Sequence, residues 1–328
     1  MVPVLSLDLH ARLAVTGSYN AEGQGVLGLT QAQVEEYVRQ GYGHAVVGLP
    51  TPWVDRYDEA VTAARQEISL LSANGVAVDA YRYLYWRENG RPRTAEDVYR
   101  DVWAALDSIK GQPVGTFWLD VESHSELNPA LRNANGEVDV EATQELVAAA
   151  HQAFVDWKAA RLDALEEREE RIWNERLSRL PPEDYAAALT ALSAQREQLQ
   201  AMQVGMYTSA SAWTELMGGT DTYAKMGLPA WVARYPSTSY TPGADLAGEF
   251  GARVEDFGGW SVGDGTIVGW QWSDGRGDRR QDFSETDFAV DRSIFYVAAS
   301  RLPAGEKEAE ATDVADTRWQ RGPGAIPE

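Results

Sequence analysis

Residues 76–121 read VAVDAYRYLYWRENGRPRTAEDVYRDVWAALDSIKGQPVGTFWLDV, and this stretch decides the fold. Two apolar runs, at 76–85 and 115–121, enclose a segment at 94–109 whose apolar residues recur with helical period. Gly111 follows this segment and is a suitable helix terminator. A strand, a helix and a second strand in this order form the repeating unit of parallel sheets and barrels.

The same unit recurs along the chain and predicts an α/β fold, a closed (β/α) barrel of the TIM type. Eight apolar runs have the length of strands: 3–9, 44–49, 76–85, 115–121, 204–208, 230–234, 267–272 and 288–295. Helical patterns at 30–40 and 57–74 separate the early runs. No convincing helix separates the last two, so we expect the barrel to be irregular at its C-terminal strands. Eight strands in about 300 residues favour a barrel over an open sheet.

The segment 141–202 interrupts this alternation. Its apolar residues recur at helical spacings on both sides of Pro181 and Pro182, which predicts an α-helical hairpin inserted within a barrel of residues 1–300. We expect the hairpin to project and to contact a protein partner or a second copy of the chain. The alternative is an elongated crossover that lies against the barrel, with an apolar seam that only packs the two helices together. Residues 301–328 are polar and acidic, which is typical of a flexible tail.

Composition argues against several classes of partner and site. The chain has 328 residues, with 29 Lys and Arg against 50 Asp and Glu, and its net charge of −21 repels nucleic acid and anionic membrane surfaces. No apolar run approaches the ~18 residues of a membrane span, and the N-terminal residues do not have the pattern of a signal peptide. With no cysteine and four histidines, we expect no disulfide, no metal site and no cofactor.

The sharpest local feature is the pair Asp120 and Glu122 at the end of a predicted strand. Side chains alternate along a strand, so the two carboxylates share one face, where their repulsion must raise at least one pKa. Glycoside cleavage uses such a pair, because it needs a protonated carboxylic acid and an ionised carboxylate. The pair alone also fits a strand end with two solvated acids. Asp8 and Asp291 lie in the first and last predicted strands, which are neighbours in a closed barrel, so we expect all four acids at one rim.

Aromatic residues occupy comparable strand ends. Rings beside carboxylates are typical of a saccharide site, although a core uses the same residue types. The predicted substrate-binding residues are Tyr81, Tyr83, Tyr207, Trp231, Tyr235, Trp270 and Gln271.

In their order along the chain, these motifs resemble the glycoside hydrolase family 25 lysozymes (N-acetylmuramidases). The resemblance covers nearly all of residues 1–300 except the hairpin, and it rests on Asp8, Gly41-Tyr42, Ala80-Tyr81-Arg82-Tyr83, Leu119-Asp120-Val121-Glu122, Gly205-Met206-Tyr207-Thr208, Pro229-Ala230-Trp231-Val232-Ala233-Arg234-Tyr235, Trp270-Gln271-Trp272-Ser273 and Val290-Asp291. It implies cleavage of the β-1,4 bond between N-acetylmuramic acid and N-acetylglucosamine in peptidoglycan glycan strands. Glu122 is then the general acid, Asp120 tunes it and steadies the developing charge or the substrate acetamido group, and Asp8 and Asp291 are supporting carboxylates.

The resemblance and the strand spacing leave two questions open. Residues two apart on a strand are ~6.6 Å apart, between the separations of retaining and inverting enzymes, so the spacing does not fix the stereochemical course; the family suggests retention. With no signal peptide pattern, the resemblance implies a product made in the cytoplasm that acts on the cell wall and is phage-encoded or virion-associated.

The chain also departs from the family at positions expected on the rim. Residues 7–10 replace the usual early Gly-Ile-Asp-Val motif, and Arg82 replaces a histidine after the tyrosine of the third strand. These departures keep a second function open: a catalytically silent, structural or glycan-binding component of a phage tail or wall-associated assembly. A chitinase-type barrel is disfavoured, because that family has an acid at the position of Trp118.

Overall fold

The computed structural model describes part of the chain, and the following statements concern that part. The described residues are 1–9, 18–19, 25–26, 29–52, 57–124, 128–176, 182–236, 243–273 and 291–297. The predicted tail at 301–328, and residues 288–290 of the last predicted strand, lie outside them.

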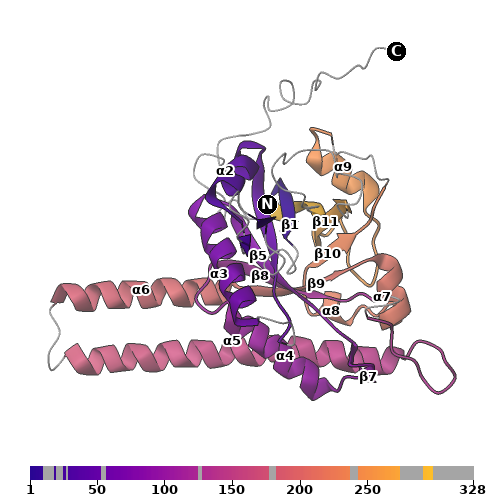
Figure 1. Cartoon of the computed structure of the whole chain (residues 1–328), viewed down its shortest axis with the longest axis horizontal. Helices are drawn as coiled ribbons and strands as arrows, with labels where there is room; N and C mark the ends of the chain where they lie inside the picture. Colours follow the sequence, from indigo (N-terminus) through magenta and orange to yellow (C-terminus); the bar gives the residue numbers. More distant parts are fainter. Residues whose placement is uncertain are drawn as a thin grey trace, which may run out of the picture.

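Eight strands close into a barrel in the order β1-β12-β11-β10-β9-β8-β5-β4 (Figure 1). They are β1 (Val2–Leu9), β4 (Tyr42–Gly48), β5 (Ala77–Tyr83), β8 (Val114–Asp120), β9 (Gln203–Thr208), β10 (Ala230–Ala233), β11 (Ile267–Ser273) and β12 (Asp291–Val297). The pairs from β1 through β4, β5, β8, β9 and β10 to β11 are parallel. The predicted fold class is confirmed, and the observed strands lie within a few residues of the predicted ones.

The irregular part of the barrel is β12, which runs antiparallel to both β11 and β1. An antiparallel neighbour does not need a crossover helix, which explains why the sequence has no helical pattern before this strand. The register places Asp291 opposite Asp8. The first residue of β12 therefore reaches the barrel end at which the other strands finish.

Eight helices are described around the strands. They are α2 (Gln31–Arg39), α3 (Tyr57–Ala73), α4 (Ala95–Ser108), α5 (Val140–Arg176), α6 (Pro182–Ala201), α7 (Ala210–Met217), α8 (Thr222–Lys225) and α9 (Leu246–Arg253). Thr30 and Thr94 form capping boxes at the starts of α2 and α4. Gly41 has φ +88°, a conformation that favours glycine, and turns the chain from α2 into β4. None of the described helices is long and apolar enough to cross a membrane.

Two short antiparallel strand pairs accompany the barrel. They are β2 (Ser18–Tyr19) with β3 (Gly25–Val26), and β6 (Arg87–Glu88) with β7 (Arg91–Pro92). The second pair follows the carboxyl end of β5, so it lies beside the barrel end that carries the acids.

The strands bury apolar side chains on both faces. The inner cluster fills the barrel and consists of Val46, Ala77, Tyr81, Trp118, Tyr207, Trp231, Ala233, Phe295 and Val297. The larger outer cluster packs the strands against the helices and includes Val47, Leu119 and Trp270. Because side chains fill the barrel, its interior is a core rather than a channel, and an active site is expected at one of its ends.

A polar chain crosses the inner cluster. Nδ1 of His44 lies 2.7 Å from Oγ of Ser6, and Nε2 lies 3.2 Å from the carboxylate of Asp79. That carboxylate accepts hydrogen bonds from Nε1 of Trp118 (3.0 Å) and the backbone N–H of Thr116 (2.8 Å). His44 is fully buried, so these polar groups lie close together inside the barrel.

The predicted helical hairpin is formed by α5 and α6. The first half of α5 packs against α4 and β8 and buries Phe154 and Trp157, as a barrel crossover helix does. From residue 158 to 174 every side chain is exposed or half-buried, and this part projects from the barrel beside α6 (Figure 1). Nζ of Lys158 donates to the carbonyl oxygens of Gln200 (2.8 Å) and Met202 (2.7 Å), where α6 returns to the barrel.

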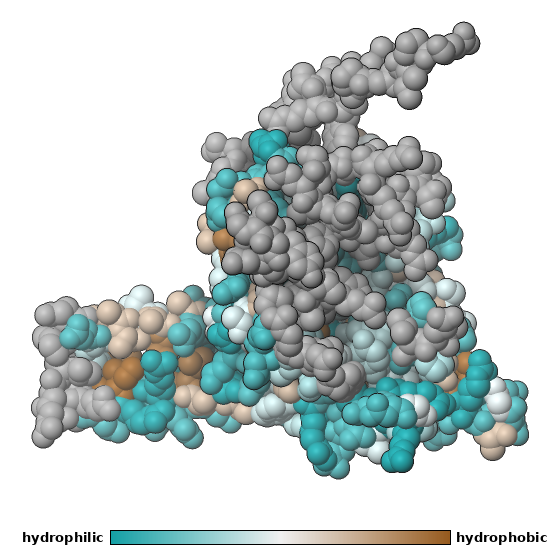
Figure 2. All heavy atoms as spheres, in the orientation of Figure 1, coloured by the Kyte–Doolittle hydropathy of each residue, from teal (hydrophilic) through white to brown (hydrophobic). Residues whose placement is uncertain are grey.

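The projecting part has an apolar seam. Tyr185 and Leu192 of α6 are buried, and the rings of Trp173 and Tyr185 meet edge to face at 5.3 Å. Figure 2 shows hydrophobic side chains gathered between the two helices. The seam accounts for the packing of the helices on each other, and contact with another chain stays a prediction.

Candidate active site

Three of the four predicted acids have described side chains, and all three lie at the carboxyl end of the barrel. Asp120 is the last residue of β8, Glu122 follows it two residues later, and Asp8 lies near the end of β1. Asp8 and Asp120 are 7% and 4% exposed, and Glu122 is half-buried. Asp120 interacts electrostatically with both other acids. Of Asp291 only the backbone is described, paired with Asp8.

Burial raises the pKa of two acids at this end, Asp120 and Glu122. Burial, followed by the charges of Glu122 and Asp8, raises the pKa of Asp120 well above its usual range. Burial raises the pKa of Glu122 to about 7. Oδ1 of Asp120 has no hydrogen-bond partner among the described residues, so no donor there stabilises its charged form. Asp120 and Glu122 together therefore keep a proton close to neutral pH.

Gln271 of β11 connects Asp8 to two tyrosines. Its Nε2 donates to Oδ2 of Asp8 at 3.1 Å. Its Oε1 accepts hydrogen bonds from the hydroxyls of Tyr207 and Tyr235, the latter at 3.0 Å. Because both hydroxyls hold the amide oxygen, the amide nitrogen must face Asp8. The structure thus brings Gln271 to the acids as a partner of Asp8.

The predicted aromatic residues lie at different depths. Tyr83 is half-buried at the end of β5, and Tyr235 is 48% exposed just after β10. Burial, followed by the charge of Asp120, raises the pKa of Tyr83. Tyr81 and Trp231 are buried in the inner cluster, where their ring centroids are 6.4 Å apart. Only Tyr83 and Tyr235 of these four are therefore placed to meet a ligand.

The structure does not bring Trp270 to the acids. Trp270 is fully buried in the outer cluster, and its indole N–H donates to the carbonyl oxygen of Arg234 at 2.8 Å. Neighbouring residues of a strand point to opposite faces, so Gln271 faces the inside of the barrel and Trp270 faces outward.

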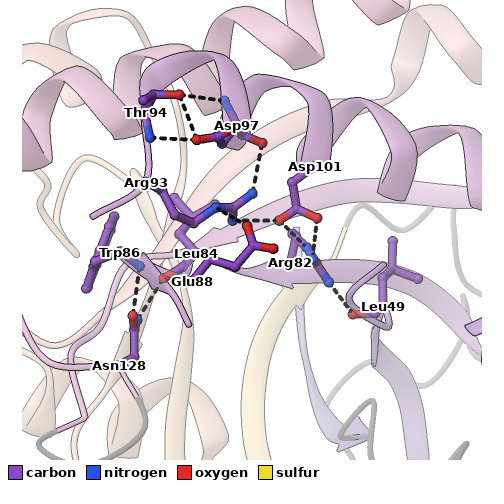
Figure 3. Close-up of polar contacts among 10 residues, drawn as sticks. All are labelled: Leu49, Arg82, Leu84, Trp86, Glu88, Arg93, Thr94, Asp97, Asp101 and Asn128. Atoms are coloured by element: carbon purple, nitrogen blue, oxygen red, sulfur yellow. Dashed lines mark hydrogen bonds and ion pairs between the residues drawn. The ribbon is translucent and has the colours of Figure 1, made fainter. Parts of the chain in front are cut away.

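Arg82, expected on the rim, instead points towards Asp101 and the backbone of Leu49 (Figure 3). Its guanidinium pairs with Asp101 of α4 through Nε at 3.2 Å and donates to the carbonyl oxygen of Leu49 at 3.1 Å. Arg93 pairs with the same carboxylate at 3.2 Å. Arg82 therefore ties β5 to α4.

Sequence analysis missed two residues behind Glu122. Trp86 and Asn128 are fully buried, and both donate hydrogen bonds to the main-chain carbonyl oxygen of Glu122. Trp86 follows a predicted strand, so the strand-end rule that selected Tyr83 could have found it. The role of Asn128 depends on how the loop after β8 closes, and no local sequence signal carries that information.

The site has the chemistry of an acid–base centre. A protonated carboxyl beside an ionised one can donate a proton and stabilise positive charge. Within the described ranges, no group of three or more His, Asp or Glu side chains is arranged to hold a metal ion.

Comparison with known proteins gives a distant structural similarity. No family model matches the sequence, and no curated protein matches it. Among solved structures, the chain is similar to a multimodular pneumococcal cell wall endolysin from phage Cp-1 in complex with choline, with 11% sequence identity and a TM-score of 0.41. The match covers 89% of this chain and 54% of that one, so the chain spans about half the length of the endolysin.

Proposed function

We propose that the chain is a peptidoglycan hydrolase that cleaves the β-1,4 bond between N-acetylmuramic acid and N-acetylglucosamine, with Glu122 as the general acid. The observation that supports this is the gathering of Asp8, Asp120 and Glu122 at the carboxyl end of the barrel strands. Active sites of barrel enzymes lie at this end. The substrate class comes from the ordered motifs of the sequence.

Glu122 supplies the proton in this proposal. A carboxyl group whose pKa is about 7 is largely protonated in mildly acidic solution and still gives up its proton readily. The proton passes to the glycosidic oxygen as the bond from that oxygen to the anomeric carbon breaks, and the bonding electrons stay with the oxygen. Water then adds to the anomeric carbon and returns a proton to Glu122.

Asp8 and Asp120 act on the positive charge that develops at the anomeric carbon. Asp8 is assigned the ionised form, because the N–H of Gln271 that it accepts favours a charged carboxylate. Asp120 steadies the same charge or the acetamido group of the substrate. Asp291, which pairs with Asp8 through the backbone, is a further supporting carboxylate, and Tyr83 and Tyr235 are the rings that contact the sugar.

Purified cell walls provide the test. We expect loss of turbidity with new N-acetylmuramic acid reducing ends, and a rate at least ~100-fold lower for Glu122→Gln. Glu67→Gln is the matched control, because Glu67 is also a buried glutamate with its pKa raised to about 7, but it lies on α3 and accepts a hydrogen bond from the backbone of Leu29. This control should keep the parent rate.

Two outcomes contradict the proposal. Parent activity in Glu122→Gln removes Glu122 as the acid. Binding of the chain to cell walls without new reducing ends supports the silent glycan-binding component instead.

A further inference from the structure

We infer that Trp86 and Asn128 are positioning residues for Glu122, and that they act by holding its main-chain carbonyl group. Their two donors form a clamp, defined as Nε1 of Trp86 and Nδ2 of Asn128 on the carbonyl oxygen of Glu122. The inference rests on the proposed function of Glu122 as the general acid.

The clamp lies just beyond the last backbone hydrogen bonds at the end of β8. The backbone N–H of Leu84 donates to the carbonyl oxygen of Asp120 at 3.0 Å, and the N–H of Val121 donates to that of Tyr207 at 2.8 Å. Glu122 lies beyond these bonds. Its carbonyl oxygen instead accepts from Nε1 of Trp86 at 2.8 Å and from Nδ2 of Asn128 at 3.3 Å. These two side chains thus hold the backbone one residue beyond the last hydrogen bonds of the barrel strands.

Asn128 is committed to this arrangement by all of its polar atoms. Its Oδ1 accepts the backbone N–H of Trp86 at 2.7 Å, and its Nδ2 also donates to the carbonyl oxygen of Leu84 at 2.8 Å. Its backbone exchanges two hydrogen bonds with His124, two residues after Glu122, at 3.0 and 2.9 Å. Asn128 therefore fixes the loop after β8 to the segment after β5.

Trp86 is held from the opposite side (Figure 3). Its carbonyl oxygen accepts the backbone N–H of Arg93 at 3.0 Å. The guanidinium of Arg93 pairs with Asp101 and donates to the carbonyl oxygen of Asp97 at 2.8 Å. The clamp is therefore anchored to α4, a rigid element outside the barrel.

A fixed carbonyl group matters because an acid catalyst must meet its acceptor in one geometry, and small displacements reduce the rate strongly. Among the described residues, the ionisable groups around Glu122 are Asp120 on β8, Tyr207 on β9, Tyr83 on β5 and, beside Asp120, Asp8 on β1. Without the clamp, Glu122 can turn towards water. Its pKa, now raised to about 7 by burial, should then fall towards the usual glutamate value.

Trp86→Phe tests the clamp, because it keeps an aromatic ring and removes the N–H donor. Trp260→Phe is the matched control: Trp260 is 1% exposed, and its indole N–H donates to the carbonyl oxygen of Leu228 at 2.7 Å, before the start of β10 and so at the opposite end of the barrel. Both variants lose one buried indole hydrogen bond. On cell walls, Trp86→Phe should lower kcat at least 10-fold with little change in KM, and should shift the basic limb of the pH profile to lower pH. Trp260→Phe should keep both parent properties.

A carboxyl ¹³C NMR titration of the full chain measures the same effect without any catalysis. The spectra of Glu122→Gln and Glu67→Gln assign the two glutamates that titrate near pH 7. We expect the pKa of Glu122 to fall by at least one unit in Trp86→Phe and to stay in place in Trp260→Phe. Asn128→Leu, which removes both hydrogen bonds of Nδ2 without adding a charge, should shift this pKa in the same direction and provides a second variant.

The outcomes separate the two proposals. An unchanged Glu122 pKa in both clamp variants overturns the clamp, whether or not the chain cleaves cell walls. A shifted pKa in a chain whose parent form leaves walls intact keeps the clamp and rejects the hydrolase.

Discussion

Gln271 and Asp8 are separated by 263 residues in sequence, yet the amide of one donates to the carboxylate of the other at 3.1 Å. Their strands, β11 and β1, are not neighbours, because β12 lies between them. The hydrogen bond therefore spans the closing strand on the inside of the barrel and links the two ends of the sheet.

We predict that Gln271→Leu destabilises the fold by about 2–4 kcal/mol, because it leaves buried polar atoms of Asp8 and Tyr207 without this partner. Tyr235→Phe removes a hydroxyl from the same amide at a half-exposed site and should cost less than about 1 kcal/mol. Urea denaturation at pH 7 measures both. Equal losses of unfolding free energy in the two variants would show that the burial of Gln271 does not determine how much stability is lost.

The shared carboxylate of Asp101 gives a second prediction. Asp101→Asn removes the carboxylate shared by the buried guanidiniums of Arg82 and Arg93, while Glu88 stays 3.9 Å from Arg93, and should cost about 3–5 kcal/mol. Glu96→Gln breaks the exposed pair with Arg100 on the same helix, and should change stability by less than about 0.5 kcal/mol. Thermal and urea denaturation of both variants test the contrast, and a small loss in Asp101→Asn would contradict it.

The raised pKa of Glu67 predicts how the stability of the fold depends on pH. Its pKa is raised from 4.5 to about 7 in the folded chain, so the folded state binds more protons than the unfolded state between these values. Its contribution to stability therefore falls as pH rises through this window, by up to about 3 kcal/mol. Glu67→Gln should be more stable than the parent at pH 8 and show a weaker decline from pH 5 to 8. A parallel pH dependence of the two urea midpoints would falsify the assignment.

We propose that the projecting part of the hairpin is dispensable for the barrel. Replacing residues 162–196 with a short Gly/Ser linker removes both partners of the Glu169–Arg196 pair and keeps Lys158 bonded to the carbonyl oxygens of Gln200 and Met202 around the end of α6. We expect an unfolding free energy within about 1 kcal/mol of the parent, because surface segments of this kind have few contacts with the core. The same linker across 150–196 also deletes Phe154 and Trp157 and should unfold the chain. Calorimetry distinguishes the two designs.

Much of the barrel could be predicted because its signals are local. Capping residues such as Thr30 and Thr94, and the apolar runs between the helices, act within a few residues of themselves. The absence of a helical pattern before β12 also had a local cause, since an antiparallel strand needs only a loop.

The direction in which individual side chains point, into the barrel or outward, was harder to predict. Trp270 and Gln271 are adjacent in a run of aromatic and polar residues, and only the register of β11 decides which of them turns inward. Tyr81 and Tyr83 share a face because they lie two residues apart on β5, but Tyr81 lies one layer deeper and belongs to the inner cluster. Depth along a strand depends on the stagger of the whole barrel, which no single strand encodes.

The position of β12 also determines when the barrel can close during synthesis. Residues 291–297 pair with residues 2–9, so the barrel closes only when β12, the last of its eight strands in sequence, has been synthesised. Until then β1 has one free edge, and Asp8 has not met Asp291. A nascent chain can fold its helices and parallel strands early, but it pairs Asp8 with Asp291 only after residues 291–297 have been synthesised, which delays any reaction that depends on this pairing.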